Sequence, residues 1–220
     1  MFDINLQYTD RESKARFVFT KYQSILSGSI LDVGADKAYL KSLLPTDTQY
    51  LGIDIESSEF VQSINLEKDQ LPFAPGQFNC VLALDVLEHV DNIYEVFDSL
   101  CRVSADYVII SLPNPWAAMI AALQNGSYQD GMHMKFYGLP IEPPADRHKW
   151  FFSYSEAKGF VHARAAINSM HVLDIYTESI VQPQAITDLL QVWGSLGKGI
   201  IPEDLYIGTQ WYVLKKINNK

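Results

Sequence analysis

The sequence predicts an α/β protein with a doubly wound, mostly parallel sheet and helices on both faces. The first observation is that short apolar runs near residues 29–33, 49–53, 78–86 and 107–112 alternate with segments of helical pattern. Alternating strands and helices pair in parallel through right-handed crossovers. The second is that these runs are almost continuously apolar, as strands covered on both faces are, and that three of them stop at Gly34, Asp54 and Pro113.

Size and composition narrow the class further. The chain has 220 residues, of which 48% are apolar, so we expect residues 1–220 to form a single domain with a sizeable core. Its net charge of −9 makes nucleic acid an unexpected main partner. Cys80 and Cys101 lack CxxC spacing, which favours a reducing, cytoplasmic location. We expect no membrane span, because no stretch of about 18 apolar residues occurs.

The elements follow from local signals. Thr9 and Glu12 have the spacing of a capping box, which predicts an N-terminal helix at about 9–27 that stops near Gly28. After the first strand, the spacing of Tyr39, Leu40, Leu43 and Leu44 predicts a helix that Pro45 ends. We further expect strands at 60–64, 171–176 and 206–214, a helix from Asp91, and a helix that Ser155 caps and that runs to about Asn168. Residues 180–203 show no clear pattern.

Residues 124–150 form an irregular insertion rich in glycine, proline and aromatic residues. A connection of this length without regular structure is more often a lid or a binding loop than a neutral linker. We therefore expect this insertion to cover an acceptor.

Four motifs occur in order along the predicted sheet. They are ILDVGADKAYL (30–40), GIDIE (52–56), NLEKDQLPF (65–73) and FNCVLALDVLEHV (78–90). Together they resemble the class I S-adenosylmethionine-dependent methyltransferases over about residues 30–115, with weaker similarity at 148–157. The resemblance implies a Rossmann-like sheet of seven strands whose last strand is antiparallel, and S-adenosyl-L-methionine as the cofactor.

The residue types suit such a ligand. The Gly34 turn lets the backbone approach closely, and a helix N-terminus after it would offer N–H groups to a carboxylate. The resemblance makes Asp54 the ribose ligand, Asn65 a donor and acceptor to adenine, and Leu66 a packing partner of the ring. The full expected cofactor set is Asp32, Gly34, Ala35, Asp36, Ala38, Asp54, Ile55, Asn65, Leu66, Leu84 and Asp85.

Two positions depart from the family pattern. Asp36 and Ala38 stand where the family usually has glycine, and the Asp36 charge would repel the methionine carboxylate unless Lys37 or a backbone rearrangement compensates. The form D-x-G-x-D-x-A-Y-L is similar to the turn of bacterial tRNA adenine-N1 methyltransferases, which use this cofactor. A nicotinamide dinucleotide fits less well, because Asp36 takes the place of the second glycine of G-x-G-x-x-G, and the turn lacks the Gly-Lys-Ser/Thr of a P-loop.

The acceptor side is less defined. A hydroxyl or amine acceptor has a proton to lose, for which histidine is suited. Our catalytic candidates are His89, His133 and His148, whereas His162 and His171 fit structural roles. Candidates for acceptor binding are Asn114, Tyr137, Arg147 and Trp150. No histidine grouping in the sequence has convincing metal-site spacing, so no metal is expected.

Three functions remain open from the sequence. The first is methyl transfer to a small-molecule or lipid-linked acceptor. The second is a catalytically silent protein of the same fold that binds a nucleoside or a protein partner, an alternative that Asp36 and Ala38 raise. The third is a tRNA methyltransferase, which the unusual turn suggests and the −9 charge opposes.

Overall fold

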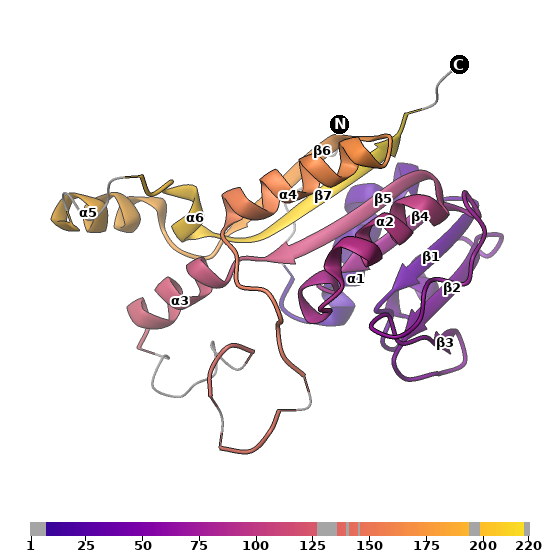
Figure 1. The fold of residues 1–220 in the computed structure, drawn as a ribbon, viewed down its shortest axis with the longest axis horizontal. Helices are drawn as coiled ribbons and strands as arrows, with labels where there is room; N and C mark the ends of the chain where they lie inside the picture. The colour runs from indigo at the N-terminus through magenta and orange to yellow at the C-terminus, as the bar shows by residue number, and fades with distance from the viewer. Residues whose placement is uncertain (1–7, 127–135, 140, 145, 194–198, 218–220) are drawn as a thin grey trace.

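The structure is a computed structural model that describes residues 8–126, 136–139, 141–144, 146–193 and 199–217. Its centre is a seven-stranded sheet with the order β3-β2-β1-β4-β5-β7-β6 (Figure 1). The strands are β1 (Ser29–Val33), β2 (Gln49–Asp54), β3 (Val61–Ser63), β4 (Phe78–Leu84), β5 (Ser104–Pro113), β6 (Met170–Ser179) and β7 (Ile207–Lys216). The last strand, β7, pairs antiparallel with both β5 and β6, and the remaining pairings are parallel. The predicted fold class is confirmed.

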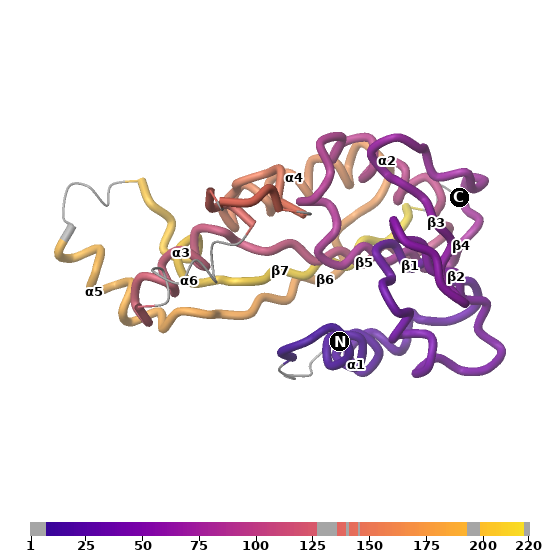
Figure 2. The backbone as a smooth tube through the Cα atoms, turned by 90° about the horizontal axis from the view of Figure 1, so that it is seen from below, coloured from indigo at the N-terminus to yellow at the C-terminus, as the bar shows by residue number. Residues whose placement is uncertain are grey.

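Helices cover both faces of this sheet. Figure 2 shows α1 on one side and α2 and α4 on the other. The α-helices are α1 (Arg11–Tyr22), α2 (Ile93–Val103), α3 (Pro115–Gln124), α4 (Tyr154–Ile167), α5 (Pro183–Trp193) and α6 (Glu203–Tyr206). Short 3-10 helices are η1 (Gln23–Ile25), η2 (Tyr39–Leu43) and η3 (Leu87–His89). The doubly wound arrangement therefore comes from helices on either side of the same strands.

Two apolar cores lie on the two faces of the sheet. Phe97 of α2 and Val161 of α4 belong to one core, and Phe17 of α1 packs in the other against Trp211 of β7, with ring centroids 4.9 Å apart. All four side chains are almost completely buried. Burial of apolar surface on both faces fixes the sheet, so the loops at its edge are held in place.

The N-terminal helix begins one position later than Thr9 and Glu12 predict. Asp10 is the N-cap residue: its carboxylate accepts the Ser13 N–H at 2.7 Å, and the Ser13 hydroxyl in turn accepts the Asp10 N–H at 3.1 Å. These reciprocal bonds satisfy two backbone N–H groups at the start of the helix, those of Asp10 and Ser13. The predicted capping pair is therefore wrong, although the predicted helix is present.

The helix predicted after the Gly34 turn is only the five-residue 3-10 helix η2. Ala38, immediately before it, has a left-handed backbone with φ 54°, and Pro45 follows shortly after. Few residues are left between these two interruptions for an α-helix. The α-helical N-terminus that we expected to face a carboxylate is therefore not formed.

The C-terminal part contains elements that the sequence analysis did not place. Helix α3 ends where the expected insertion at 124–150 begins, and Asn114 caps it with Pro115 in its first turn. The Ser153 hydroxyl, rather than that of Ser155, caps α4 in a capping box with Glu156. Residues 180–203 include α5 and lead into α6. Among the described residues, no helix combines the length and apolar character needed to cross a membrane.

Candidate functional site

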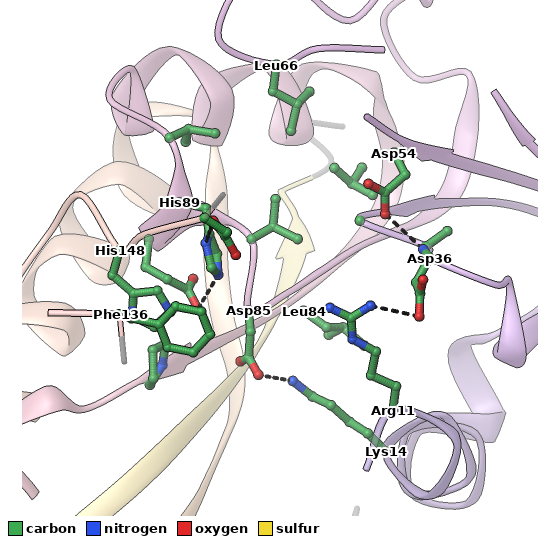
Figure 3. Close-up of a pocket in the computed structure, with 18 of the residues that line it drawn as sticks. Arg11, Lys14, Asp36, Asp54, Leu66, Leu84, Asp85, His89, Phe136 and His148 are labelled. Carbon is green, nitrogen blue, oxygen red and sulfur yellow. Dashed lines mark hydrogen bonds and ion pairs between the residues drawn. The ribbon is translucent and has the colours of Figure 1, made fainter. Parts of the chain in front are cut away.

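A cleft of about 1010 Å³ opens at the carboxyl ends of β1, β2 and β4 (Figure 3). β1 pairs with β2 on one side and β4 on the other, so the order of strands along the chain reverses at β1. In open α/β sheets, ligands bind in the crevice at such a reversal. The position of the cleft is thus set by the topology.

The Gly34 turn forms one wall of the cleft. Its φ of +75° lies in the left-handed region, and a Cβ atom here would lie 2.5 Å from Cγ2 of Val86. Asp36 and Ala38 are also left-handed, with φ of 48° and 54°. These are the positions at which the resemblance leads one to expect glycine, so the backbone keeps the glycine-like shape without the glycines.

Asp54 ties the end of β2 to this turn. One carboxylate oxygen accepts the Ile55 N–H at 2.7 Å and the other accepts the Asp36 N–H at 2.9 Å. Each carboxylate oxygen has a further lone pair that can accept another bond. The carboxylate is therefore oriented by the backbone and can still accept hydroxyl groups from a ligand.

The negative charge of Asp36 has a partner in α1. A guanidinium nitrogen of Arg11 lies 2.7 Å from a carboxylate oxygen of Asp36, and this hydrogen bond raises the pKa of Arg11 (Figure 3). From the sequence, Lys37 or a backbone rearrangement is expected to compensate this charge. The cation is instead supplied by the N-terminal helix, which sequence reasoning did not connect with the cleft.

Asp32, at the end of β1, is buried beneath the turn. The Tyr50 hydroxyl donates to its carboxylate at 2.7 Å. Burial raises the pKa of Asp32 to about 6, while the Tyr50 bond lowers it and the charge of Asp54 raises it further. The Asp32 carboxyl group therefore takes up a proton at a higher pH than the carboxyl group of an exposed aspartate does.

Asp85, after β4, is held by a second cation from α1. Lys14 forms an ion pair with its carboxylate and also contacts the Ser111 hydroxyl at 3.1 Å, and Ser111 bonds Asp85 at 2.5 Å. Desolvation raises the pKa of Asp85, but Lys14 and Ser111 outweigh it and the pKa is lowered. An ionised carboxylate therefore stands at the centre of the cleft.

Asn65 and Leu66 line the cleft beyond β3. The side-chain oxygen of Asn65 accepts the Glu67 N–H at 3.0 Å, which makes Asn65 part of a turn. Its NH₂ group is then the part of the side chain suited to face a ligand. Leu66 is partly buried against the core.

The opposite wall brings η3 together with residues after the insertion. The Nδ1 atom of His89 lies 2.7 Å from an Asp146 carboxylate oxygen, and the Tyr137 hydroxyl lies 2.7 Å from Nδ1 of His148. The imidazole rings of His89 and His148 meet edge to face, with ring centroids 4.4 Å apart. The Phe136 ring stacks on the His148 ring, with centroids 4.3 Å apart. Two of the three predicted catalytic histidines are therefore neighbours.

Glu88 adds a buried carboxylate to this wall. Its side chain is 0% exposed, and neither carboxylate oxygen has a hydrogen-bond partner among the described residues. Burial raises its pKa well above the usual value, and the Asp85 charge adds to this effect. In the sequence, Glu88 is one polar residue at the start of a turn, and its burial depends on distant segments.

The expected site residues divide into three groups. The cleft is lined by Asp32, Gly34, Ala35, Asp36, Asp54, Ile55, Asn65, Leu66, Leu84, Asp85, His89, Asn114, Tyr137, Arg147 and His148. Ala38 and Trp150 are not among its lining residues: Ala38 packs with Ala35 and Val61, and the Trp150 indole donates to the Val90 carbonyl at 2.8 Å. A buried indole N–H needs such an acceptor. His133 lies outside the described residues.

Asn114 and Arg147 line the cleft while serving the fold. The Asn114 side chain accepts the Trp116 N–H at 3.0 Å and donates to the carbonyls of Asp204 at 2.8 Å and Ile207 at 2.7 Å. Arg147 donates to the carbonyls of Tyr137 and Gly138. These bonds give both side chains a structural role beside the ligand-binding role that we expected.

Residues 6–172 match a family model described as a methyltransferase domain. The match spans most of the chain, which therefore belongs to this family of methyltransferase domains. The resemblance seen in the sequence motifs is thereby confirmed. No curated protein matches the chain in sequence.

Solved structures share the fold at low sequence identity. A SAM-dependent methyltransferase from Archaeoglobus fulgidus aligns with a TM-score of 0.57 and 14% identity, covering 93% of this chain and 94% of the other. Geranyl diphosphate methyltransferase in complex with SAM has a TM-score of 0.54 and 11% identity, covering 94% and 85%. The cyclase SpnF has a TM-score of 0.54 and 12% identity, covering 93% and 81%. The neighbours thus include a methyltransferase with bound cofactor and an enzyme of another reaction class.

Proposed function

We propose that this protein transfers a methyl group from S-adenosyl-L-methionine to the hydroxyl or amine of a small-molecule or lipid-linked acceptor. The observation that carries the proposal is the cleft itself. It lies at the strand reversal, has room for a nucleoside, and is lined by the Gly34 turn and Asp54 in the places that the family motifs imply. A turn closed off by its own side chains would have contradicted it.

The chain's own residues fit the cofactor. The Asp54 carboxylate, oriented by two backbone N–H groups, would hold the ribose hydroxyls. Ile55, Asn65 and Leu66 would flank the adenine ring. The amino-acid tail would lie along the Gly34 turn, where Arg11 offsets the charge of Asp36. When bound, S-adenosylmethionine supplies a methyl group on a positively charged sulfur, which an acceptor displaces in line.

The acceptor would approach from the wall that carries His89, Tyr137 and His148. These groups lie across the same cleft from the Gly34 turn, so the acceptor and the cofactor would share one space. A protein promotes this kind of displacement mainly by aligning the acceptor with the methyl group and by excluding water from around the reacting atoms. The two buried cysteines, Cys80 and Cys101, are free thiols, in keeping with the cytoplasmic location that we propose.

The two alternatives gain less support. The silent-scaffold hypothesis depended on Asp36 and Ala38, and both adopt the backbone shape of the glycines that they replace. The tRNA hypothesis still faces the −9 net charge.

Calorimetric titration with S-adenosylmethionine and S-adenosylhomocysteine tests the proposal. We expect binding of both compounds, and a loss of about 1.5–3 kcal/mol in binding free energy for Asp54→Ala, as for a hydrogen bond to a charged group. Asp47→Ala, an exposed aspartate before β2, is the matched control and should bind as the unaltered protein does. Absence of heat with both nucleosides would refute cofactor binding, and unchanged affinity in Asp54→Ala would place the ribose elsewhere.

A further inference from the structure

Glu88, His89 and His148 place three metal-ligating groups at one point of the cleft. Their ligand atoms, one carboxylate oxygen and two imidazole nitrogens, lie within 4.8 Å of one another. All three residues line the cleft that also holds the Gly34 turn. Two ligands at roughly 2.0–2.2 Å from one ion stand at most about 4.4 Å apart, so small side-chain rotations would bring all three onto one ion.

The Glu88 carboxyl group lies in the cluster without a hydrogen-bond partner, and a bound proton or a bound metal ion would neutralise it there. It is completely buried, and both of its oxygens lack a hydrogen-bond partner among the described residues. The nearest ionisable partner is Nε2 of His89, 3.9 Å from Oε1, which is too long for a hydrogen bond. Burying an unpaired polar group is costly, and buried carboxylates are usually paired or coordinate metals. The buried oxygens therefore point to a cation in the cluster.

The two histidines are oriented as metal ligands are. Asp146 contacts Nδ1 of His89, and Tyr137 contacts Nδ1 of His148. A carboxylate or hydroxyl on one ring nitrogen fixes the ring and sets the direction of the other nitrogen. Stacking of Phe136 on His148, with an interplanar angle of 9°, restrains that ring further.

From these contacts we infer that Glu88, His89 and His148 bind one divalent transition-metal ion with the ligand preferences of zinc. Two imidazoles and one carboxylate are the protein ligands of one type of catalytic zinc site, whereas Mg²⁺ and Ca²⁺ prefer oxygen ligands. Three protein ligands leave a coordination position for water or for an oxygen of a bound molecule. Metal binding goes beyond the proposed function and does not depend on it.

The assignment also gives the two histidines a defined role. As ligands, they would act on an acceptor through the ion instead of taking its proton directly. If the proposed methyl transfer is correct, the open position would favour acceptors that present an oxygen atom to the ion. Asp146 would be a positioning residue that holds His89.

The test is a zinc titration of protein that has been treated with a chelator and dialysed. We expect one Zn²⁺ per chain, measured by competition with a chromophoric chelator, and visible d–d absorption when Co²⁺ replaces Zn²⁺. Glu88→Gln and His148→Ala should each weaken zinc binding at least tenfold, and Asp146→Asn by about tenfold, as outer partners of ligands do. His162→Ala, an exposed histidine of α4, is the matched control and should bind zinc unchanged.

Several outcomes would overturn the inference. They are the absence of stoichiometric zinc binding, zinc binding that Glu88→Gln and His148→Ala leave unchanged, or binding of Mg²⁺ in preference to Zn²⁺. Thermal unfolding and circular dichroism establish that each variant is folded. Titration of the metal-free protein with S-adenosylhomocysteine tests the proposed function separately. Zinc binding without nucleoside binding would refute only the proposed function, and the reverse result would refute only the metal site.

Discussion

Lys14 of α1 forms an ion pair with Asp85 beyond the end of β4, across 71 positions of sequence. The Lys14 side chain is only 11% exposed, and the same ammonium group contacts Ser111 of β5. The N-terminal helix thus contributes directly to the wall of the cleft (Figure 3). Neither residue has a feature in the sequence that indicates the other.

Replacing Lys14 by Met should therefore destabilise the protein. Asp85 would lose its charged partner. Because Lys14 is nearly buried whereas the Asp85 side chain is 40% exposed and solvent screens part of the pair, we expect the free energy of unfolding to fall by about 1–2 kcal/mol. Arg16→Met is the matched control, because its pair with Glu12 is 63% and 58% exposed and should contribute less than about 0.5 kcal/mol. Urea denaturation measures both. Equal effects of the two changes would contradict the prediction.

Gly34→Ala should destabilise the turn for two separable reasons. The left-handed φ costs about 1–2 kcal/mol for a residue with a Cβ, and the close approach to Val86 should add about 1–3 kcal/mol. Gly126→Ala has the same φ of +75° and no atom within 4 Å of the added Cβ, so it should show the first effect alone. Denaturant unfolding of both variants measures the difference.

A second substitution checks the steric part. Val86→Ala removes the methyl group that the new Cβ would meet, so it should restore part of the stability lost in Gly34→Ala. The cost of the left-handed backbone should remain. If the double variant is as unstable as the additive sum of the single variants, the contact with Val86 is not the cause.

Asp32 should give the stability of the protein a defined pH dependence. Its pKa is raised from 3.8 to about 6 in the folded state, so its contribution to stability is fully present below the unfolded pKa and is lost as the pH rises through 6. The loss amounts to about 3 kcal/mol. Asp32→Asn keeps an acceptor for the Tyr50 hydroxyl without the charge. Relative to the unaltered protein, this variant should become more stable between about pH 4 and about pH 7.

Chemical denaturation at a series of pH values measures this difference. The two stability curves should diverge over that interval, with the variant above the unaltered protein at neutral pH. Parallel curves would mean that the Asp32 carboxyl group is not raised in pKa by its burial.

Asn114 should matter for stability more than for acceptor binding. Its side chain caps α3 and donates to two backbone carbonyls, while it is only 1% exposed. Asn114→Ala should cost about 2–4 kcal/mol, because buried carbonyls lose their donors and the helix loses its cap. Asn114→Asp keeps the cap but places a carboxylate against both carbonyls, so it should be at least as destabilised. A large loss of activity in Asn114→Ala without loss of stability would contradict this role.

The sequence by itself determined the sheet and the residues that line the proposed cofactor side of the cleft. Alternating apolar runs predicted the strand positions to within three residues, because a strand covered on both faces requires continuous apolar sequence. Asp54, Gly34 and Asn65 could be found because each lies at or just after the carboxyl end of a strand, and these ends of parallel strands meet at one edge of the sheet. The capping residue of α1 was missed because several polar residues near it had similar spacing.

Only the tertiary structure decided the other half. Arg11 and Lys14 reach the cleft because α1 packs on the sheet beside it, a placement that depends on distant residues such as Trp211. The wall at Glu88 likewise joins distant segments, because His148 meets His89 only after a long insertion. Contacts between distant segments carry no local periodicity in the sequence. The sequence therefore shows which charged and metal-ligating residues the chain contains, but it does not show that they meet at this cleft.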